Sequence, residues 1–153
     1  MRHEGRDEVL CMAEHSELAK SVSSVEQLKR YVRLSPDDAT LLKQIVKVHP
    51  MRISPYYLSL IDWNDPDDPI RKMAVPSAEE LDLEGCYDTS GEAENTRGQG
   101  LQHKYSETAL ILATNRCAMY CRYCFRKRLV GLSSHEILRR LEDAANYILI
   151  TGE

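Results

Sequence analysis

The sequence lacks any apolar run that approaches the roughly 20 residues of a membrane-spanning helix. Residues 1–10 are charged and contain no apolar core of the kind found in a secretory signal. The chain also lacks an excess of basic residues: its net charge is −4, which argues against general nucleic-acid binding. Internal repeats and low-complexity tracts are missing too. We therefore expect neither a membrane protein nor a nucleic-acid-binding protein.

The composition is that of a folded chain. Of the 153 residues, 42% are apolar and 29% are charged, which is enough for one domain's core and is unlike a disordered tail. Five cysteines without a secretory signal are typical of a reducing compartment. We expect a cytoplasmic protein.

Residues 1–61 are predicted to form a helical module. Ser24 with Gln27 three residues later is a capping box, the local signature of a helix start. Ser35 and Ser54 each precede a proline, which places a capping hydroxyl before a residue suited to the first helical position. Apolar residues recur at helical spacing after these starts.

Residues 62–105 are expected to be an acidic and mostly irregular linker. Residues 62–94 contain eleven acidic residues against two basic ones, together with three prolines. A single helical turn is predicted at residues 77–81, and residues 88–100 are rich in small polar residues that favour a flexible segment. The acidic cluster lacks the spacing, the central glycine and the closing glutamate of a calcium loop.

Residues 106–153 have the pattern of an α/β protein. The run 109–113 is short and continuously apolar, as in a parallel strand buried on both faces. Ser133 to Glu136 forms a capping box that starts an amphipathic helix, and residues 147–151 have the pattern of a second buried strand. Together these pieces predict one βαβ unit, so the fold class is α/β with an N-terminal helical module.

Three cysteines stand in eight residues, between residues 109–113 and a basic run. Cys117, Cys121 and Cys124 have spacings of four and three. Three thiolates can hold three corners of a four-iron, four-sulfur (4Fe-4S) cluster and leave the fourth iron open. Zinc would need a fourth ligand, and no candidate has the usual finger spacing. The candidates are Cys11, Cys86, His103 and His135.

The motif Cys-x3-Cys-x2-Cys, with Tyr123 before the last cysteine, resembles the signature of the radical S-adenosylmethionine enzymes. The longer stretch of residues 114–128 is similar to one branch, the lysine 2,3-aminomutase family. Residues 51–57 and 68–77 resemble the same branch, and the likeness runs from about residue 41 to residue 131. The resemblance implies that residues 106–153 begin a radical S-adenosylmethionine barrel, a TIM-like fold.

This resemblance implies a chemistry and a set of partners. S-adenosylmethionine would chelate the open iron and be cleaved by one electron, giving a 5′-deoxyadenosyl radical that abstracts a hydrogen atom from an unactivated carbon. Pyridoxal 5′-phosphate would carry the migrating amino group as an imine. The substrate would be lysine or a related amino acid, and the electron donor a protein such as flavodoxin or ferredoxin. The family also makes a homo-oligomer plausible.

Family position also implies roles for residues around the cysteines. Tyr123 would pack against the adenosine, and Arg126 would hold the substrate carboxylate. Arg126 belongs to a local excess of basic residues that would attract anions. These basic residues are Arg116, Arg122, Arg126, Lys127 and Arg128. The residues that would bind the other cofactor groups are His103, Lys104 and Tyr105 on the phosphate side of pyridoxal phosphate, and Gly152 and Glu153 at the methionine amino group.

The sequence departs from the family pattern in several places. Lys104 replaces the usual arginine, and Thr108 stands where a second arginine is common. Only 29 residues follow Cys124, whereas a full barrel takes about 250, and the lysine that forms the Schiff base is not in the chain. We expect the N-terminal portion of an aminomutase-like enzyme, inactive in this form. The alternatives are a non-catalytic iron–sulfur-binding remnant and an aminomutase that acts on a protein-bound lysine.

Overall fold

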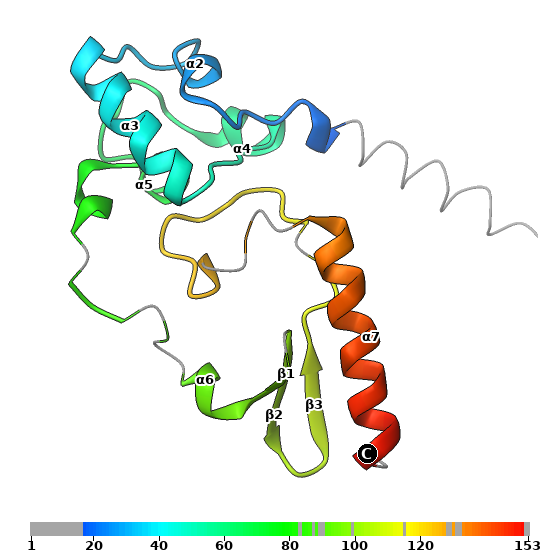
Figure 1. Ribbon diagram of the computed structural model, residues 1–153. Coiled ribbons are helices and arrows are strands. Elements are labelled where there is room, and N and C mark those ends of the chain that lie inside the picture. Colours follow the sequence, from blue (N-terminus) through cyan, green and yellow to red (C-terminus); the bar gives the residue numbers. More distant parts are fainter. Residues whose placement is uncertain are drawn as a thin grey trace, which may run out of the picture. The chain divides into compact units, whose positions relative to one another are not determined.

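The structure is a computed structural model of the chain, shown in Figure 1. It describes residues 17–82, 84–86, 88, 91–98, 100–114, 116–127, 130 and 133–151. The chain divides into two units. The first unit consists of Met1–Leu83 and Cys117–Cys124, and the second of Glu84–Arg116 and Phe125–Glu153. Among the described helices, none combines the length and the apolar character needed to cross a membrane.

The first unit is built from short helices, as the sequence predicts. Ser24 closes the predicted capping box with Gln27, and the predicted turn at residues 77–81 is present as a 3₁₀ helix. A further helix begins after Asp68, whose carboxylate accepts a hydrogen bond from the Arg71 N–H at 2.7 Å. The elements are α2 (Val25–Leu28), α3 (Pro36–Val48), α4 (Pro55–Leu60), α5 (Pro69–Ala74) and η1 (Ala78–Leu81).

The start of α3 gives the first testable prediction. The Ser35 hydroxyl accepts a hydrogen bond from the Asp38 N–H at 3.0 Å, so Ser35→Ala should cost about 1 kcal/mol of stability in the first unit. Thr40→Ala in the same helix is the matched control, because the exposed Thr40 hydroxyl donates only to the Pro36 carbonyl at 2.9 Å. Urea denaturation of both variants measures the difference, and equal midpoints would contradict the capping role.

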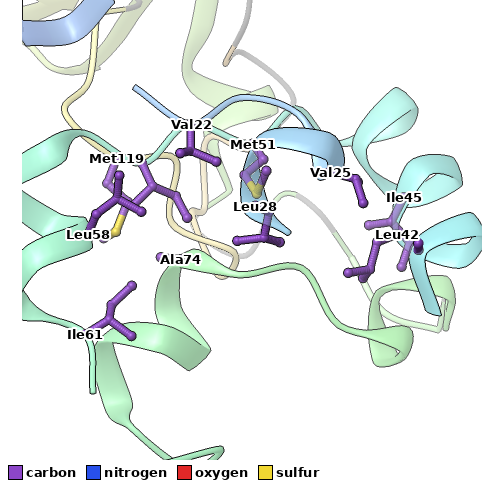
Figure 2. Packing of buried hydrophobic residues seen from close by; sticks show 12 residues of the cluster. Val22, Val25, Leu28, Leu42, Ile45, Met51, Leu58, Ile61, Ala74 and Met119 are labelled. Atoms are coloured by element: carbon purple, nitrogen blue, oxygen red, sulfur yellow. The ribbon is translucent and has the colours of Figure 1, made fainter. Parts of the chain in front are cut away.

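One apolar core joins these helices to the cysteine segment (Figure 2). Ile53 is fully buried and forms isolated antiparallel bridges with Val22 on one side and with Met119 on the other. Met119 lies between Cys117 and Cys121, so the cysteine segment is part of this core rather than a separate flap. The buried members are Val22, Val25, Leu28, Ala39, Leu42, Ile45, Met51, Ile53, Leu58, Ile61, Ala74 and Met119.

The second unit contains a three-stranded antiparallel sheet in the order β1-β2-β3 and one long helix. A two-residue turn at Ser106 and Glu107 joins β2 to β3, with Tyr105 opposite Thr108. The elements are α6 (Glu92–Asn95), β1 (Thr96–Gly98), β2 (Leu101–Tyr105), β3 (Thr108–Ile111) and α7 (Ser134–Thr151). The chain is therefore a mixed α/β protein, with more regular structure between residues 62 and 105 than the sequence suggests.

The prediction of a buried parallel strand at residues 109–113 is wrong. A strand is present, but it pairs antiparallel with β2, and Leu110 and Ile111 are 42% and 37% exposed. The cause is local, since the hairpin turn after Tyr105 fixes the direction of the next strand. A short apolar run does not by itself tell a parallel strand from an antiparallel one.

The predicted second strand at residues 147–151 is wrong too, because α7 continues through these residues. Neither glycine nor proline interrupts residues 134–151, and burial recurs at helical spacing, with Ile137 and Ala144 buried seven residues apart. Leu149 and Ile150, which suggested a strand, are 80% and 85% exposed. The described residues thus contain no βαβ unit, although Ser133 caps the helix as predicted, accepting from the Glu136 N–H at 3.1 Å.

Glu136 makes the start of α7 sensitive to acid. Hydrogen bonds from Arg139 and then Arg140 hold the pKa of Glu136 below its ordinary value of 4.5. A carboxyl group whose pKa is lowered by folding stabilises the fold when the pH is above its ordinary pKa. This contribution is lost as the pH falls through the lower pKa of the folded state.

We therefore expect amide protection in α7 to decline as the pH falls below 4.5, and Glu136→Gln to remove part of that decline. Hydrogen exchange followed by mass spectrometry measures this, with corrections for the intrinsic pH dependence of exchange. An identical decline in the native chain and the variant would show that Glu136 is not responsible.

Candidate metal centre

The cysteine segment, Cys117–Cys124, is fixed to the first unit by backbone contacts. Residues 118–122 run along the segment that precedes α4 and reach the end of α5, and Met119 continues the bridge through Ile53. The hydrogen bonds are Ser54 N–H to the Ala118 carbonyl (3.0 Å), Tyr120 N–H to the Arg52 carbonyl (2.9 Å) and Arg122 N–H to the Met73 carbonyl (2.8 Å). The core therefore sets where the cysteines lie.

Cys117 precedes this anchored stretch, Cys121 lies within it and Cys124 follows it. Cys117 is exposed, Cys121 and Cys124 are half-buried, and all three are outside disulfides. The Cys124 N–H donates to the Cys121 carbonyl at 3.1 Å, so Cys121 to Cys124 forms one tight turn. Burial raises the pKa of the Cys121 thiol, and the nearby Cys124 and Cys117 thiolates raise it further. The charges of Cys124 and Cys117 thus act on the Cys121 sulfur.

This donor set suits a cluster better than a single ion. Within the described ranges, no group of three or more His, Cys, Asp or Glu side chains is close enough to hold one metal ion. Zinc needs its ligands around one point, whereas the three thiolates of a 4Fe-4S cluster bind three different irons. The repulsion among three thiolates is also relieved when they bind a cationic centre. The chemistry of the donors therefore fits the cluster, and Cys11 lies outside the described residues.

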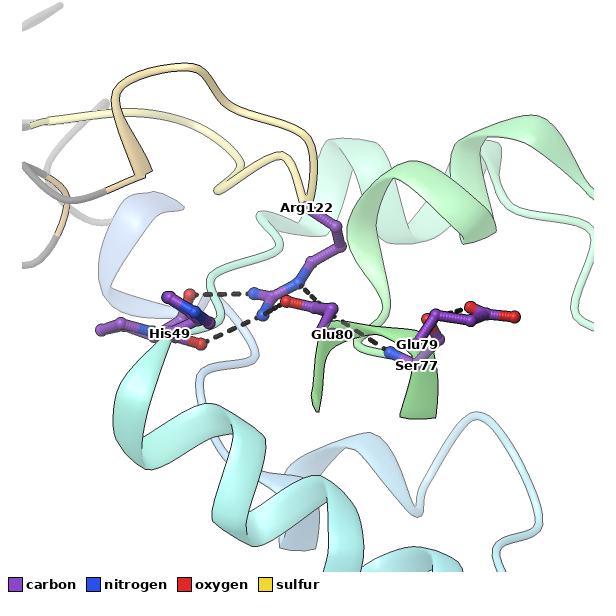
Figure 3. Close-up of polar contacts among 6 residues, drawn as sticks. His49, Ser77, Glu79, Glu80 and Arg122 are labelled. Carbon is purple, nitrogen blue, oxygen red and sulfur yellow. Dashed lines mark hydrogen bonds and ion pairs between the residues drawn. The ribbon is translucent and has the colours of Figure 1, made fainter. Parts of the chain in front are cut away.

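Arg122, within the cysteine segment, is held in a polar cage (Figure 3). Its guanidinium binds both carboxylate oxygens of Glu80, at 2.8 and 2.7 Å, and the two side chains are 7% and 10% exposed. The remaining contacts are to the Pro50 carbonyl at 3.0 Å and the His49 carbonyl at 3.1 Å. Arg122 belongs to the basic run that was expected to attract anions, but here it makes internal contacts.

Arg126, the residue expected to hold a substrate carboxylate, lies in the second unit. Its Nε donates to Glu92 at 3.2 Å, and its guanidinium carbon lies 4.7 Å from the centre of the Phe125 ring. The Glu92 side chain is only 5% exposed, whereas that of Arg126 is 29% exposed. Arg126 is therefore oriented by a buried carboxylate and an aromatic ring while part of it stays accessible.

Tyr123 is 73% exposed in the turn between Cys121 and Cys124. Its hydroxyl donates to the Met73 sulfur at 2.8 Å. The exposure leaves ring surface for a ligand, as the expected adenosine contact requires. Gly152 and Glu153, expected at the methionine amino group, lie outside the described residues.

The three residues expected near a cofactor phosphate lie along β2. His103 is half-buried, and its Nδ1 is 3.0 Å from the hydroxyl of Tyr147 on α7. Lys104 and Tyr105 are exposed, with the Lys104 ammonium 5.8 Å from the centre of the Tyr105 ring. Lys104 is thus accessible to an anion, while His103 already contacts α7.

Sequence reasoning missed Glu80 as a contact of the cysteine segment. It lies 42 residues before Arg122, and its only local signal is the capping box with Ser77, which predicts a helix start and no more. Without the fold, the sequence does not indicate which of its many acidic residues would pair with this arginine.

Comparison with known proteins found relatives over most of the chain, although no family model matches it. The L-lysine 2,3-aminomutase of Clostridium subterminale is 42% identical over 138 residues, covering 86% of this chain and 32% of that protein. The Bacillus subtilis L-lysine 2,3-aminomutase is 37% identical over 143 residues, or 90% of this chain and 30% of that protein. The Clostridioides difficile glutamate 2,3-aminomutase is 33% identical over 134 residues, covering 86% of this chain and 32% of that protein. The chain spans about a third of the length of these relatives.

Proposed function

We propose that this chain, which is homologous to lysine 2,3-aminomutases, provides the cluster-binding segment of an enzyme. The proposed enzyme moves an amino group from one carbon to the next in lysine or a related amino acid. Cys117, Cys121 and Cys124 are the proposed ligands of a 4Fe-4S cluster. One observation carries this proposal: three disulfide-free thiols lie on a single segment that the core holds in place. Three thiolate ligands leave one iron open to a small molecule.

The proposed cofactors supply chemistry that side chains lack. If bound, the cluster with S-adenosylmethionine on its open iron and an electron from a flavodoxin or ferredoxin would supply the chemistry to remove an unactivated hydrogen, and pyridoxal phosphate would hold the amino group. The chain's own residues bind and orient these groups. Tyr123 offers an exposed ring to the adenosine. Lys104 offers a point charge to the phosphate, and His103 and Tyr105 lie beside it on the same strand. Gly152 and Glu153 would offer polar groups to the methionine.

Arg126 is proposed to bind the carboxylate of a small amino acid substrate. Among the described contacts, Glu92 accepts a hydrogen bond from the Nε of Arg126. The two Nη nitrogens can then donate two parallel hydrogen bonds to a substrate carboxylate. The Glu92 contact would fix the plane of the guanidinium before the substrate arrives. This arrangement suits α-amino acids such as lysine or glutamate. Separately, we propose from the family resemblance that the working enzyme is a homo-oligomer.

A non-catalytic iron–sulfur-binding protein is the second candidate. The observation that favours it is the continuation of α7 through residues 147–151, where a second barrel strand was expected. An aminomutase acting on a protein-bound lysine is a further variant of the first proposal. The test is to incubate the reduced, reconstituted chain with the cofactors and with free lysine, free glutamate or a lysine-containing protein. A β-amino product would identify an aminomutase and its substrate, whereas cluster binding without a product agrees with the second candidate and with the inactive N-terminal portion expected from the sequence.

Metal and sulfide content tests the cluster itself. After anaerobic reconstitution with iron and sulfide, the native chain should bind about four irons and four sulfides and show the visible absorption of an iron–sulfur cluster. Zinc bound tightly in place of iron, with no sulfide, would refute the proposal and support a zinc-binding module.

A further inference from the structure

Arg122 ties the cysteine turn to distant parts of the first unit. It follows Cys121 directly and stands two residues before Cys124. Its side chain makes four hydrogen bonds, two to Glu80 and one each to the carbonyls of His49 and Pro50. These partners lie 42 to 73 residues away along the chain. The turn is thus tied to the end of α3 and to η1 at the same time (Figure 3).

The partner carboxylate is itself fixed. Glu80 Oε1 accepts a hydrogen bond from the Ser77 N–H at 3.3 Å as part of the η1 capping box. A planar guanidinium that meets both oxygens of a fixed carboxylate has essentially one orientation open to it. The two carbonyl contacts on the other side of Arg122 restrict it further. The orientation of η1 therefore determines the orientation of the Arg122 side chain.

Stability alone is a weak explanation for such a pair. Removing two charges from water costs about as much as their attraction returns, and well-packed apolar residues often serve the fold equally well. Apolar residues in the same place would not fix the orientation of the cysteine segment, because apolar contacts have no preferred direction. Backbone hydrogen bonds already hold residues 118–122 against the core. The ion pair adds a directional restraint at Arg122, the second residue of the turn from Cys121 to Cys124.

We propose that Glu80 and Arg122 are positioning residues for the cluster, setting the separation and direction of the Cys121 and Cys124 thiols through the buried ion pair. This inference rests on the proposed cluster at the three cysteines. In this role Arg122 would bind no iron itself, because its guanidinium contacts Glu80, Pro50 and His49, and it would fix the segment that carries the ligands. Because its guanidinium makes these internal contacts, Arg122 differs from the accessible Arg126 and is unavailable for anion binding.

The test compares three variants of the full chain after anaerobic reconstitution. Glu80→Gln keeps the shape of the side chain and removes its charge. The double variant Glu80→Leu/Arg122→Met replaces the pair by apolar side chains and leaves no buried charge, so it keeps the fold if the single variant does not. Asp67→Asn is the matched control, because it breaks the exposed ion pair between Lys72 and Asp67, whose side chains are 62% and 78% exposed.

Three readouts apply to each variant: the thermal midpoint, the iron affinity in competition with a chelator, and the electron paramagnetic resonance spectrum of the reduced cluster. We expect Glu80→Gln and the double variant to lose iron affinity by roughly 10- to 100-fold and to broaden the spectrum. The double variant should do so with a thermal midpoint near that of the native chain. Asp67→Asn should match the native chain in all three.

Native iron affinity and a native spectrum in the double variant would overturn the positioning role and leave the pair a purely structural one. A native chain that binds no iron at all would instead refute the proposed function. The two failures are therefore distinguishable.

Discussion

Cys121→Ser should abolish stable cluster binding. Loss of an outer-shell partner already weakens metal affinity by roughly 10- to 100-fold, and loss of a ligand should cost more. A serine hydroxyl remains protonated at neutral pH and is a poor ligand for iron in a sulfur-bound cluster. The measurement is iron and sulfide content after anaerobic reconstitution and gel filtration. Cys117→Ser and Cys124→Ser should behave in the same way.

Cys86→Ser is the matched control for this series. Cys86 is exposed, and within the described residues its sulfur accepts a hydrogen bond from the Asp88 N–H at 3.3 Å. Serine preserves that contact, so iron and sulfide content should equal those of the native chain. If Cys86→Ser lost iron as completely as Cys121→Ser, the ligand assignment would be wrong.

Leu28→Ala should strongly destabilise the first unit. Leu28 is a 0% exposed member of the core, and truncating a fully buried leucine costs about 2 to 5 kcal/mol through lost contacts and the cavity left behind. Met119 packs in the same core, so the cysteine segment should lose iron more readily as well. Urea denaturation gives the change in the free energy of unfolding, and chelator competition gives the change in iron retention.

Val48→Ala provides the comparison for Leu28→Ala. Val48 ends α3 and is 71% exposed, so its truncation should change stability by less than about 0.5 kcal/mol. Equal losses in the two variants would mean that the core does not have the composition described. Loss of stability in Leu28→Ala without any change in iron retention would uncouple the cysteine segment from the core.

The helices of the first unit could be predicted because their signals are local. Ser24, Ser35 and Ser77 each bond within four residues of themselves, and such contacts depend on neighbours in sequence rather than on the fold. The same logic would have found α5, where Asp68 precedes Pro69 and caps the helix. The prolines in the acidic segment favoured an irregular chain and concealed this start.

The second unit was harder to predict because its apolar runs are ambiguous. Residues 147–151 contain the β-branched and aromatic residues of a strand, yet they continue a helix that has no break after residue 134. Burial decided the outcome: the helical positions of Ile137 and Ala144 pack inward, and Leu149 and Ile150 remain outside. A resemblance to barrel enzymes also favoured the strand, although that expectation came from longer proteins.

The cysteine motif and its family were recognisable from sequence alone, and the relatives confirm the family resemblance. The residues that surround the motif in the fold could not be predicted from the sequence. The Glu80–Arg122 pair and the bridge from Ile53 to Met119 join residues more than 40 positions apart, and no spacing rule predicts such contacts. The roles of the three cysteines remain predictions that the experiments above address. The roles of Tyr123, Arg126 and residues 103–105 also remain predictions.

The most direct test of the central claim is the electron paramagnetic resonance spectrum of the reduced, reconstituted chain with and without S-adenosylmethionine. The account predicts a reduced 4Fe-4S signal that changes in shape and position when S-adenosylmethionine is added, because the fourth iron has no protein ligand and binds it directly. A signal that is identical in both samples, or a chain that holds only zinc, would contradict the account.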